Sequence, residues 1–273
     1  MDLTAAIVLF NHKESQIRHL IESVLNTSLD IRLYLIDNSP TDELRGHFAY
    51  DKVVYIFNNA NLGYGRAHNI GVEKSLELNA KYHVILNPDL EMGAEVIDNI
   101  YQYMERNEDL GLVMPKILNE DGSMQHLCKL LPTPFDLLGR RFFGSFKWAR
   151  RLNDRYELRT FSGDYVLDTP CLSGCFMFIR TGVLRQVGGF DPRYFMYLED
   201  YDLVRRIHRV ARTVFYPEVF VVHQHGKWSY KKSSGLLKHH IQSAIKYFNK
   251  WGWFYDSERR RYNANVLSQI EVS

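Results

Sequence analysis

The sequence lacks the features that mark membrane-spanning, secreted and disulfide-bonded proteins. Its 273 residues contain no apolar run of about 18 residues, so we expect no membrane-spanning helix. We also expect no secretion signal, because the N-terminus has neither a basic start nor a cleavage site. The three cysteines, Cys128, Cys171 and Cys175, fit neither a disulfide framework nor zinc spacing. They are expected to be small packed side chains in a reducing compartment, which predicts a cytoplasmic protein.

Internal repeats and low-complexity linkers are also absent, and the length fits one large α/β domain or two closely joined lobes. The net charge is only +2, but its distribution is uneven. Residues 140–159 carry seven Lys and Arg against two acidic residues, and residues 223–261 carry nine against two. Such basic stretches suit phosphate-rich partners, which include nucleotides, nucleic acid and anionic lipid head groups.

Apolar strands alternate with amphipathic helices in the first half of the chain. Strands separated by helices of this length form βαβ units, which predicts a mainly parallel sheet with right-handed crossovers. The predicted fold class is therefore α/β, with a Rossmann-like sheet flanked by helices. The predicted strands are 5–10, 31–36, 53–57, 82–86 and 112–114, and the predicted helices are 14–25, 65–78 and about 96–104.

The second half is less regular and begins with a long segment, residues 119–163, that is rich in aromatic and basic residues and has no clear periodicity. The chain is predicted to consist of a first half (1–115), a second half (116–232) and a basic amphipathic tail (233–273). The predicted elements after residue 163 are strands at 176–179 and 219–222, a helix at 202–210 and a helix in the tail.

Polar side chains follow the predicted parallel strands at their carboxyl ends. Asn11 follows the first strand, Asp37 follows the second, Asn58 and Asn59 follow the third, and Asp89 follows the fourth after a proline turn. Any one of these is most simply a turn residue. Four in succession indicate a ligand site, because ligands of open α/β sheets bind at this edge.

The segment 61–71 is rich in glycine and lies between a strand and a helix, where backbone N–H groups favour anions. Gly63 and Gly65 are spaced as in a dinucleotide fingerprint, but His68 stands where the third glycine belongs. The segment also follows the third strand and not the first, so a dinucleotide site is not predicted.

Two further groups of residues have side chains that suit catalysis or metal binding. Glu199, Asp200 and Asp202 stand at the head of a helix. Capping of the helix would explain the presence of one or two of these acids, and a role in proton abstraction would explain another. His223 opens the segment 223–229 after an apolar strand; such a histidine is often only hydrogen-bonded. Together with Asp89 it would suit Mg²⁺ or Mn²⁺ carrying phosphate oxygens.

Taken together, these segments resemble the inverting family 2 glycosyltransferases of the GT-A fold, in particular their rhamnosyltransferase-like branch. The resemblance extends from about Ala5 to Ser229. Single motifs are weak, whereas their order and spacing are specific. The motifs are Phe10-Asn11, Ile36-Asp37-Asn38-Ser39, Asn61-Leu62-Gly63, Asn69-Ile70-Gly71, Leu86-Asn87-Pro88-Asp89, Ser173-Gly174-Cys175-Phe176-Met177, Gly188-Gly189-Phe190-Asp191, Glu199-Asp200-Tyr201-Asp202-Leu203 and His223.

The resemblance implies that residues 1–115 bind the nucleotide sugar and that residues 116–232 bind the acceptor and carry the catalytic base. It also implies a role for each matching residue. Asp200 would be the catalytic base, with Glu199 beside it. Asp89 stands at the last position of the family's D-x-D motif and would hold a divalent metal, Mg or Mn, with His223. Asn87 replaces the first acid of that motif. The implied donor-binding residues are Asn11, Asp37, which would contact the base or ribose, Asn61, Gly63, Arg66, Asn69 and Asn87.

The implied activity is transfer of a sugar, L-rhamnose from dTDP-rhamnose, from a nucleoside-diphosphate donor to a saccharide acceptor with inversion. The resemblance places this reaction in bacterial cell-surface polysaccharide synthesis, with a lipid-linked acceptor at the cytoplasmic face of the inner membrane. The basic tail suits a membrane interface, but its apolar face equally suits packing on the domain or on a second subunit, so a homo-oligomer stays open. No nucleic-acid-binding module is recognised.

Two alternatives remain. A sugar-phosphate nucleotidyltransferase would share the α/β core, but it carries a glycine-rich basic loop after the first strand, where this chain has residues 11–14, Asn-His-Lys-Glu. A non-catalytic relative that binds only saccharide would have lost the base or the metal carboxylate, whereas Asp200 and Asp89 are both present.

Overall fold

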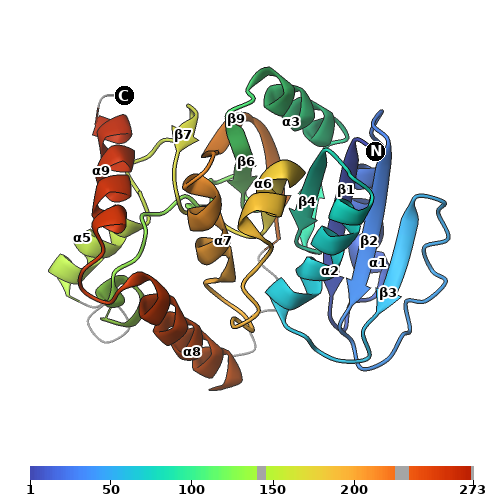
Figure 1. Ribbon diagram of the computed structural model, residues 1–273, viewed down its shortest axis with the longest axis horizontal. Helices are drawn as coiled ribbons and strands as arrows, with labels where there is room; N and C mark the ends of the chain where they lie inside the picture. Colours follow the sequence, from blue (N-terminus) through green and yellow to red (C-terminus); the bar gives the residue numbers. More distant parts are fainter. Residues whose placement is uncertain (140–145, 225–233, 272–273) are drawn as a thin grey trace.

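A computed structural model describes residues 1–139, 146–224 and 234–271 of the chain (Figure 1). Parts of the basic stretch 140–159 and of the predicted segment 223–229 therefore lie outside the described residues, as do the last two residues of the tail. The molecule is built on one central nine-stranded sheet with helices on both faces.

The predicted elements of the first half are all present. The helices among them are apolar on the side that faces the sheet. In α3, for example, Val96, Ile97, Ile100 and Met104 recur at helical spacing and are buried. The elements are β1 (Leu3–Leu9), α1 (Glu14–Leu25), β2 (Ile31–Asp37), β3 (Val53–Phe57), α2 (Tyr64–Glu77), β4 (Tyr82–Leu86), β5 (Leu90–Met92), α3 (Glu95–Arg106) and β6 (Leu110–Leu118).

The second half contains more structure than its sequence predicts. Strand β9 is three times as long as the predicted strand, because Pro217 and Glu218 interrupt its apolar run while the strand continues through them. The described part of the segment 119–163 contains a π-helical turn and a helix, and the tail contains two helices. The elements are η1 (Phe135–Gly139), α5 (Lys147–Tyr156), β7 (Leu167–Asp168), β8 (Phe176–Arg180), α6 (Thr181–Val187), α7 (Glu199–His208), β9 (Arg212–His223), α8 (Ser234–Trp251) and α9 (Ser257–Glu271).

The sheet has the strand order β3-β2-β1-β4-β8-β6-β9-β5, with β7 paired to β9. The first four strands are parallel, as predicted. Strand β8 runs antiparallel to β4 and β6, and β5 and β7 run antiparallel to β9, so the parallel arrangement is confined to β1–β4 and the β6–β9 pair. Strand β6 crosses the predicted boundary between residues 115 and 116, and both halves share one sheet.

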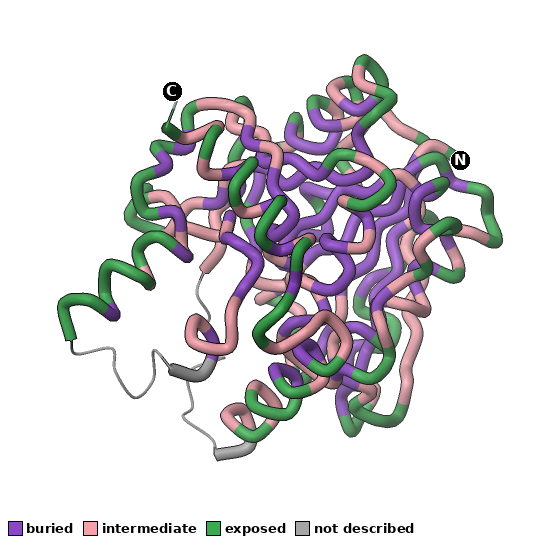
Figure 2. Tube along the Cα trace, turned by 60° about the vertical axis from the view of Figure 1, so that its left-hand side comes forward, coloured by how far each residue is buried: buried purple, intermediate pink, exposed green. Residues whose placement is uncertain are grey.

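Helices cover both faces of this sheet. Helices α2, α6 and α7 lie together in front of it in Figure 1 and contact one another in that order. On the other face lies α1, and Ser28 in the loop that follows α1 donates its hydroxyl to Asp98 of α3 at 2.6 Å. Figure 2 shows that the buried residues concentrate in the sheet and in the helix sides that face it.

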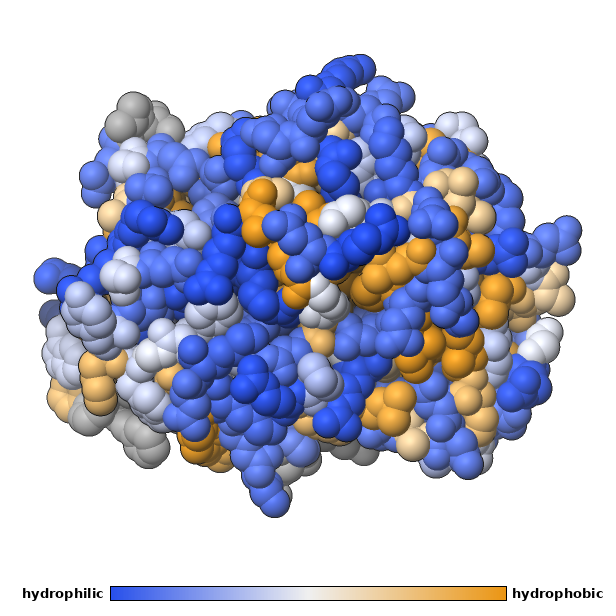
Figure 3. Space-filling model, viewed as in Figure 1, coloured by the Kyte–Doolittle hydropathy of each residue, from blue (hydrophilic) through white to orange (hydrophobic). Residues whose placement is uncertain are grey.

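The tail packs against the domain through its apolar face. In α8 the side chains of Ala244, Tyr247 and Phe248 are fully buried, and in α9 Val266 is buried as well. Where α8 lies in Figure 1, the surface in Figure 3 is mainly hydrophilic. Packing on the domain therefore accounts for part of the apolar face, whereas the large apolar side chains of Ile241, Ile245, Phe254 and Tyr255 are exposed. No helix within the described ranges has the length and apolar character needed to cross a membrane.

Candidate functional site

The predicted strand-end residues meet at one edge of the sheet. In the parallel register Leu9 of β1 lies opposite Asp37 of β2, and Ile7 lies opposite Leu86, the last residue of β4. The turns that carry Asn11, Asp37 and Asn87 therefore start side by side. Strand β8 begins at the same edge, because Phe176 pairs with Leu86 in antiparallel register.

Asp37 is an internal anchor of this edge. Its carboxylate is only 1% exposed and accepts hydrogen bonds from the backbone N–H of Ser39 (2.8 Å) and the hydroxyl of Tyr55 (2.7 Å). Asn11 is exposed, has φ of 56° and donates its N–H to the Ser39 hydroxyl at 2.8 Å. The left-handed backbone of Asn11 is tolerated best by Asn, Asp and Gly, which fits its place in a tight turn.

His12 belongs to this edge and was missed by the sequence analysis. The backbone N–H of Phe10 donates to its Nδ1 at 3.0 Å. Burial lowers the pKa of His12, while the negative charges of Asp89 and Asp37 oppose that shift. His12 therefore stands within electrostatic reach of both carboxylates. The available signal was its position directly after Asn11, at the end of the first strand.

Asp89 and His223 are brought together by the pairing of β5 with β9, in which Leu90 lies opposite His223. Oδ1 of Asp89 lies 3.2 Å from Nε2 of His223. Nδ2 of Asn87 lies 3.4 Å from the same nitrogen. The Oδ1 atom of Asp89 is buried and has no hydrogen-bond partner among the described residues.

Gln125 fixes the orientation of the His223 ring and was also missed by the sequence analysis. Its Nε2 donates to the carbonyls of His223 (2.9 Å) and Leu118 (3.3 Å), which leaves Oε1 to accept from Nδ1 of His223 at 3.2 Å. In the neutral ring Nε2 is then an acceptor that faces the Asp89 carboxylate. Gln125 lies 98 residues from His223 in the sequence, so no local pattern pointed to it.

Oδ1 of Asp89 and Nε2 of His223 thus face each other as two lone-pair-bearing atoms, and the Asp89 oxygen is buried without a hydrogen bond from any described residue. A cation bound between them would accept a lone pair from each. One carboxylate oxygen and one imidazole nitrogen, with the ring held by a neighbouring amide, suit Mn²⁺ or Mg²⁺. In the described parts of the chain no group of three or more His, Cys, Asp and Glu side chains has metal-binding geometry. Asp89 and His223 would therefore supply only part of a coordination shell.

Glu199 and Asp200 begin α7 after two non-glycine residues with left-handed backbone, Tyr197 (φ 71°) and Leu198 (φ 64°). Such residues cost about 1–3 kcal/mol each and are retained where the surroundings hold them in place. The carboxylate of Asp200 accepts the N–H groups of Gly174 (3.0 Å) and Tyr201 (2.9 Å). The side chain of Glu199 is buried, and its Oε2 has no hydrogen-bond partner among the described residues.

These surroundings act on the two acids in different ways. Burial raises the pKa of Glu199, and the charge of Asp200 raises it further. Burial also raises the pKa of Asp200, but the two backbone N–H groups oppose this shift. The two backbone N–H groups therefore favour the ionised form at Asp200, whereas nothing among the described residues hydrogen-bonds Oε2 of Glu199.

The third acid of this segment, Asp202, has a structural role. It is fully buried and accepts hydrogen bonds from Nε of Arg206 (2.8 Å) and Nε1 of Trp251 (2.8 Å). Nζ of Lys250 lies 2.6 Å away. Asp202 thus joins α7 to the tail.

The metal-type pair and the acid pair belong to one site. The hydroxyl of Tyr64 donates to the carbonyl of Gly174 at 2.7 Å, and the N–H of Asn87 donates to the carbonyl of Cys175 at 2.8 Å. Burial raises the pKa of Tyr64 well above its ordinary value, and nearby acidic groups that include both Asp200 and Asp89 raise it further. Tyr64 therefore lies within electrostatic reach of both centres.

The glycine-rich segment bends around the loop that precedes α7. Gly63 has φ of 82°, and a Cβ there would collide with the carbonyl oxygen of Phe195. Asn61 is exposed and its Oδ1 accepts the N–H of Gly63 at 3.0 Å. Nε of Arg66 donates to the carbonyl of Pro192 at 2.7 Å. The amide of Asn69 pairs with the backbone of Phe190.

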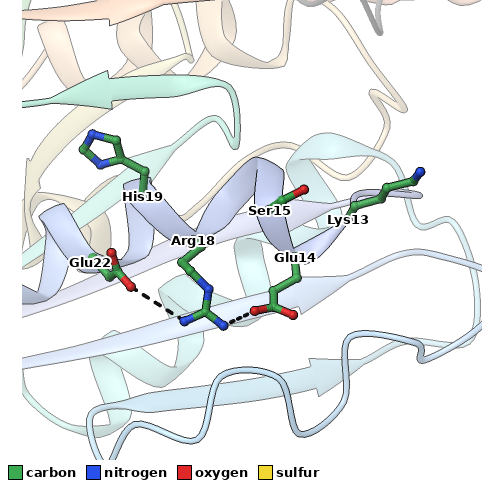
Figure 4. A pocket seen from close by; sticks show the side chains of 6 residues that line it. All are labelled: Lys13, Glu14, Ser15, Arg18, His19 and Glu22. Carbon is green, nitrogen blue, oxygen red and sulfur yellow. Dashed lines mark hydrogen bonds and ion pairs between the residues drawn. The ribbon is translucent and has the colours of Figure 1, made fainter.

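A shallow hollow on the outer side of α1 lies apart from these residues (Figure 4). Arg18 lies between Glu14 and Glu22 there and pairs with both. The charge of Arg18 is therefore compensated by these two acids. The lining of the hollow contains none of the predicted site residues. We assign it no role in binding.

A sequence model described as Glycosyl transferase family 2 matches residues 4–188. The chain is 28% identical over 207 residues to the low-salt glycan biosynthesis hexosyltransferase Agl10 of Haloferax volcanii, covering 75% of this chain but 61% of the relative. It is 28% identical over 243 residues to an N-acetylglucosaminyl-diphospho-decaprenol L-rhamnosyltransferase of Mycobacterium tuberculosis, covering 84% and 78%. It is 23% identical to the rhamnosyltransferase WbbL of Escherichia coli K12, covering 88% and 91%.

Solved structures with the same fold include GalNAc-T7 with UDP, GalNAc and Mn²⁺ (TM-score 0.63, 15% identity, 92% of this chain and 50% of that one). They also include residues 1–349 of TarS from S. aureus (TM-score 0.61, 11% identity, 98% and 71%). At these identities the likeness concerns the fold alone, and it confirms the GT-A fold expected from the sequence.

Proposed function

The chain belongs to glycosyl transferase family 2, and we propose that it transfers a sugar from a nucleoside-diphosphate donor to a hydroxyl group of a saccharide acceptor. One observation carries this proposal: Asp200, whose carboxylate accepts two backbone N–H groups, and Asp89, which pairs with His223, both lie within electrostatic reach of Tyr64. The first centre suits proton removal from an acceptor, and the second suits the diphosphate of a donor.

Asp200 is the proposed catalytic base. The acceptor oxygen forms a bond to the anomeric carbon of the sugar while the bond from that carbon to the diphosphate breaks. The hydroxyl proton moves to Asp200, and the electron pair of the broken bond leaves on the diphosphate. Attack from the face opposite the leaving group inverts the anomeric carbon, and a positioned base of this kind contributes about 10²–10⁴-fold to the rate.

Asp89 and His223 are the proposed holders of a divalent cation, Mg²⁺ or Mn²⁺. The unpaired Oδ1 of Asp89 and the acceptor Nε2 of His223 fit such an ion. When bound, it would neutralise the charge that develops on the departing diphosphate. Because Asn87 stands at the first position of the motif, one anionic ligand fewer is available, and we expect weak binding of the free ion.

The proposed donor is dTDP-L-rhamnose and the proposed acceptor is a lipid-linked saccharide of cell-surface polysaccharide synthesis. The names of the mycobacterial and E. coli relatives support the sugar, and the decaprenol in the mycobacterial name supports the lipid. The proposed nucleoside side consists of the turns that follow β1, β2 and β3. The donor-binding residues proposed are Asn11, Asp37, Asn61, Gly63, Arg66 and Asn87.

A lipid-linked acceptor would bring the protein to the cytoplasmic face of the inner membrane, and α5 is the element that suits this contact. Phe146, Trp148 and Leu152 are 54%, 49% and 41% exposed. The same helix carries four basic residues against one acid. Exposed aromatic and aliphatic side chains among basic residues favour an anionic lipid interface.

Vesicle sedimentation tests this contact with phosphatidylglycerol-containing and neutral vesicles. Each basic residue near an anionic surface contributes about 1 kcal/mol, so Arg150→Glu with Arg151→Glu is expected to lower binding at least tenfold. Lys238→Glu with Ile241→Ser on α8 is the matched control. Loss of binding in the control and not in the α5 variant would transfer the contact to the tail.

The function is tested by a screen of donor hydrolysis and transfer across nucleotide sugars with Mg²⁺ or Mn²⁺, using Asp200→Asn as the control. We expect transfer from a dTDP-sugar and a loss of about 10²–10⁴-fold in the variant. Unchanged transfer by Asp200→Asn would refute the base assignment. Pyrophosphate release from sugar phosphate and nucleoside triphosphate would instead indicate a nucleotidyltransferase.

A further inference from the structure

The loop between α6 and α7, residues 188–198, is held by the first turns of α2. Nδ2 of Asn69 donates to the carbonyl of Phe190 at 2.8 Å, and Oδ1 of Asn69 accepts the N–H of the same residue at 2.7 Å. Tyr64 donates its backbone N–H to the carbonyl of Phe195 at 3.0 Å. Together with the Arg66–Pro192 bond, three residues of one helix grip this loop along its length.

The loop ends at the site's proposed base. Its last residues, Tyr197 and Leu198, have left-handed backbone, and Glu199 and Asp200 follow directly. A loop that ends in two unfavourable conformations keeps its shape only when its other residues are fixed. The position of the Asp200 carboxylate therefore depends on the contacts made upstream in residues 188–195.

Asn69 makes the most specific of these contacts. Its amide forms a reciprocal pair of hydrogen bonds with one backbone residue, so the side chain acts as the neighbouring strand would in a sheet. Gly189 permits this approach, since a Cβ at that position would collide with Oδ1 of Asn69. Both ends of the amide are engaged by the protein, which leaves its geometry poorly suited to a donor ligand.

We propose that Asn69 is a positioning residue for the catalytic carboxylates and not a donor ligand. This inference rests on the proposed sugar transfer. It replaces the donor-binding role predicted for Asn69, while the roles of Asn61 and Gly63 on the nucleoside side are unaffected. A base displaced by about 1 Å loses as much as 100-fold in rate, so Asn69 acts on turnover.

Asn69→Ala tests the proposal by separating turnover from binding. We expect kcat to fall about 10- to 100-fold, while the Kd for dTDP and for UDP, measured by calorimetry, changes less than twofold. Asn61→Ala on the same segment is the matched control, in which nucleotide binding is expected to weaken more than kcat. A loss of nucleotide affinity in Asn69→Ala that matches its loss of activity would overturn the proposal.

Asn69→Asp provides a second readout, which keeps the test decisive if the alanine variant does not fold. An ionised aspartate cannot donate to the Phe190 carbonyl, whereas a protonated one restores both hydrogen bonds. The kcat of Asn69→Asp relative to the unmodified protein is therefore expected to rise as the pH falls. A constant ratio would contradict the proposal, whereas an unmodified protein inactive with every nucleotide sugar would instead refute the proposed function.

Discussion

The two halves of the candidate site are built in different ways. On the nucleoside side, the partners of Asp37 are Ser39 and Tyr55, which are two and 18 residues away. On the catalytic side, Gln125 lies 98 residues from His223, and Tyr64 lies 110 residues from Gly174. One half is thus assembled from local turns at strand ends, and the other by contacts that exist only after the whole sheet has formed.

The same contrast appears in two ion-pair clusters. Arg18 on α1 pairs with Glu14 and Glu22 at the surface, with its side chain 41% exposed. Arg205 on α7 is 1% exposed, grips Asp256 through two hydrogen bonds and also pairs with Glu258, all under the ring of Trp251. The comparison teaches that the tail is part of the structure that holds α7, because Asp256 and Glu258 of the tail supply the counter-charges of Arg205.

The largest expected effect follows from this second contrast. Arg205→Met leaves the buried Asp256 without its partner, and breaking a buried pair in this way costs about 3–5 kcal/mol of unfolding free energy. Arg18→Met, the matched surface change, is expected to cost less than about 1 kcal/mol. Urea unfolding of both variants measures the difference. Equal losses would mean that the tail does not stabilise α7 through this cluster.

Asp89→Asn is expected to affect catalysis more than folding. Removing one charge-stabilising group from a transition state typically costs about 10²–10³-fold in kcat. Glu91→Gln, at an exposed acid two residues further along the chain in β5, is the control and should retain activity. The measurement is kcat as a function of Mn²⁺ concentration. A similar loss of kcat in both variants would mean that Asp89 has no special role in holding a metal ion.

Gln125→Leu tests whether long-range contacts set the His223 ring. Loss of a residue that orients a metal-binding histidine costs about 10–100-fold in metal affinity. We expect a higher Mn²⁺ concentration for half-maximal activity and an unchanged kcat at saturating Mn²⁺. Gln224→Leu, the neighbouring amide on the exposed side of His223, serves as the control. An unchanged Mn²⁺ requirement in Gln125→Leu would show that β9 alone orients the ring.

The smallest expected effect is a change in pH dependence. Because burial holds the pKa of Glu199 above its usual range, the folded protein keeps a proton that the unfolded chain releases above about pH 4.3. Stability from this group is therefore present at low pH and is lost as the pH rises through the raised pKa. Glu199→Gln removes that loss, so its Tm should exceed that of the unmodified protein increasingly toward pH 9. If the Tm values of the variant and of the unmodified protein differed by the same amount at every pH, Glu199 would not be the group that holds the extra proton.

Much of the part of the site that is built from the turns after β1, β2 and β3 was predictable, because the sequence patterns that indicate it are local. The apolar strands, the turn residues at their ends and the proline that ends β4 each occupy neighbouring positions in the sequence. The roles of Asn69, His12 and Gln125 were not predictable in this way. Asn69 and Gln125 act through a loop and a ring more than 90 residues away, and His12 acquires its surroundings from the turns that follow β2 and β4.

The sequence by itself determined the alternation of strands and helices, the family motifs and the acids available for chemistry, because periodicity and turn preference depend on neighbours in the chain. Tertiary structure decided which of those acids is hydrogen-bonded in its ionised form. Glu199 and Asp200 are adjacent in sequence and similar in chemistry, but only Asp200 receives the N–H of Gly174. It also decided how the tail meets α7, because Trp251 donates to Asp202 and Asp256 pairs with Arg205, contacts that the amphipathic pattern of the tail does not indicate.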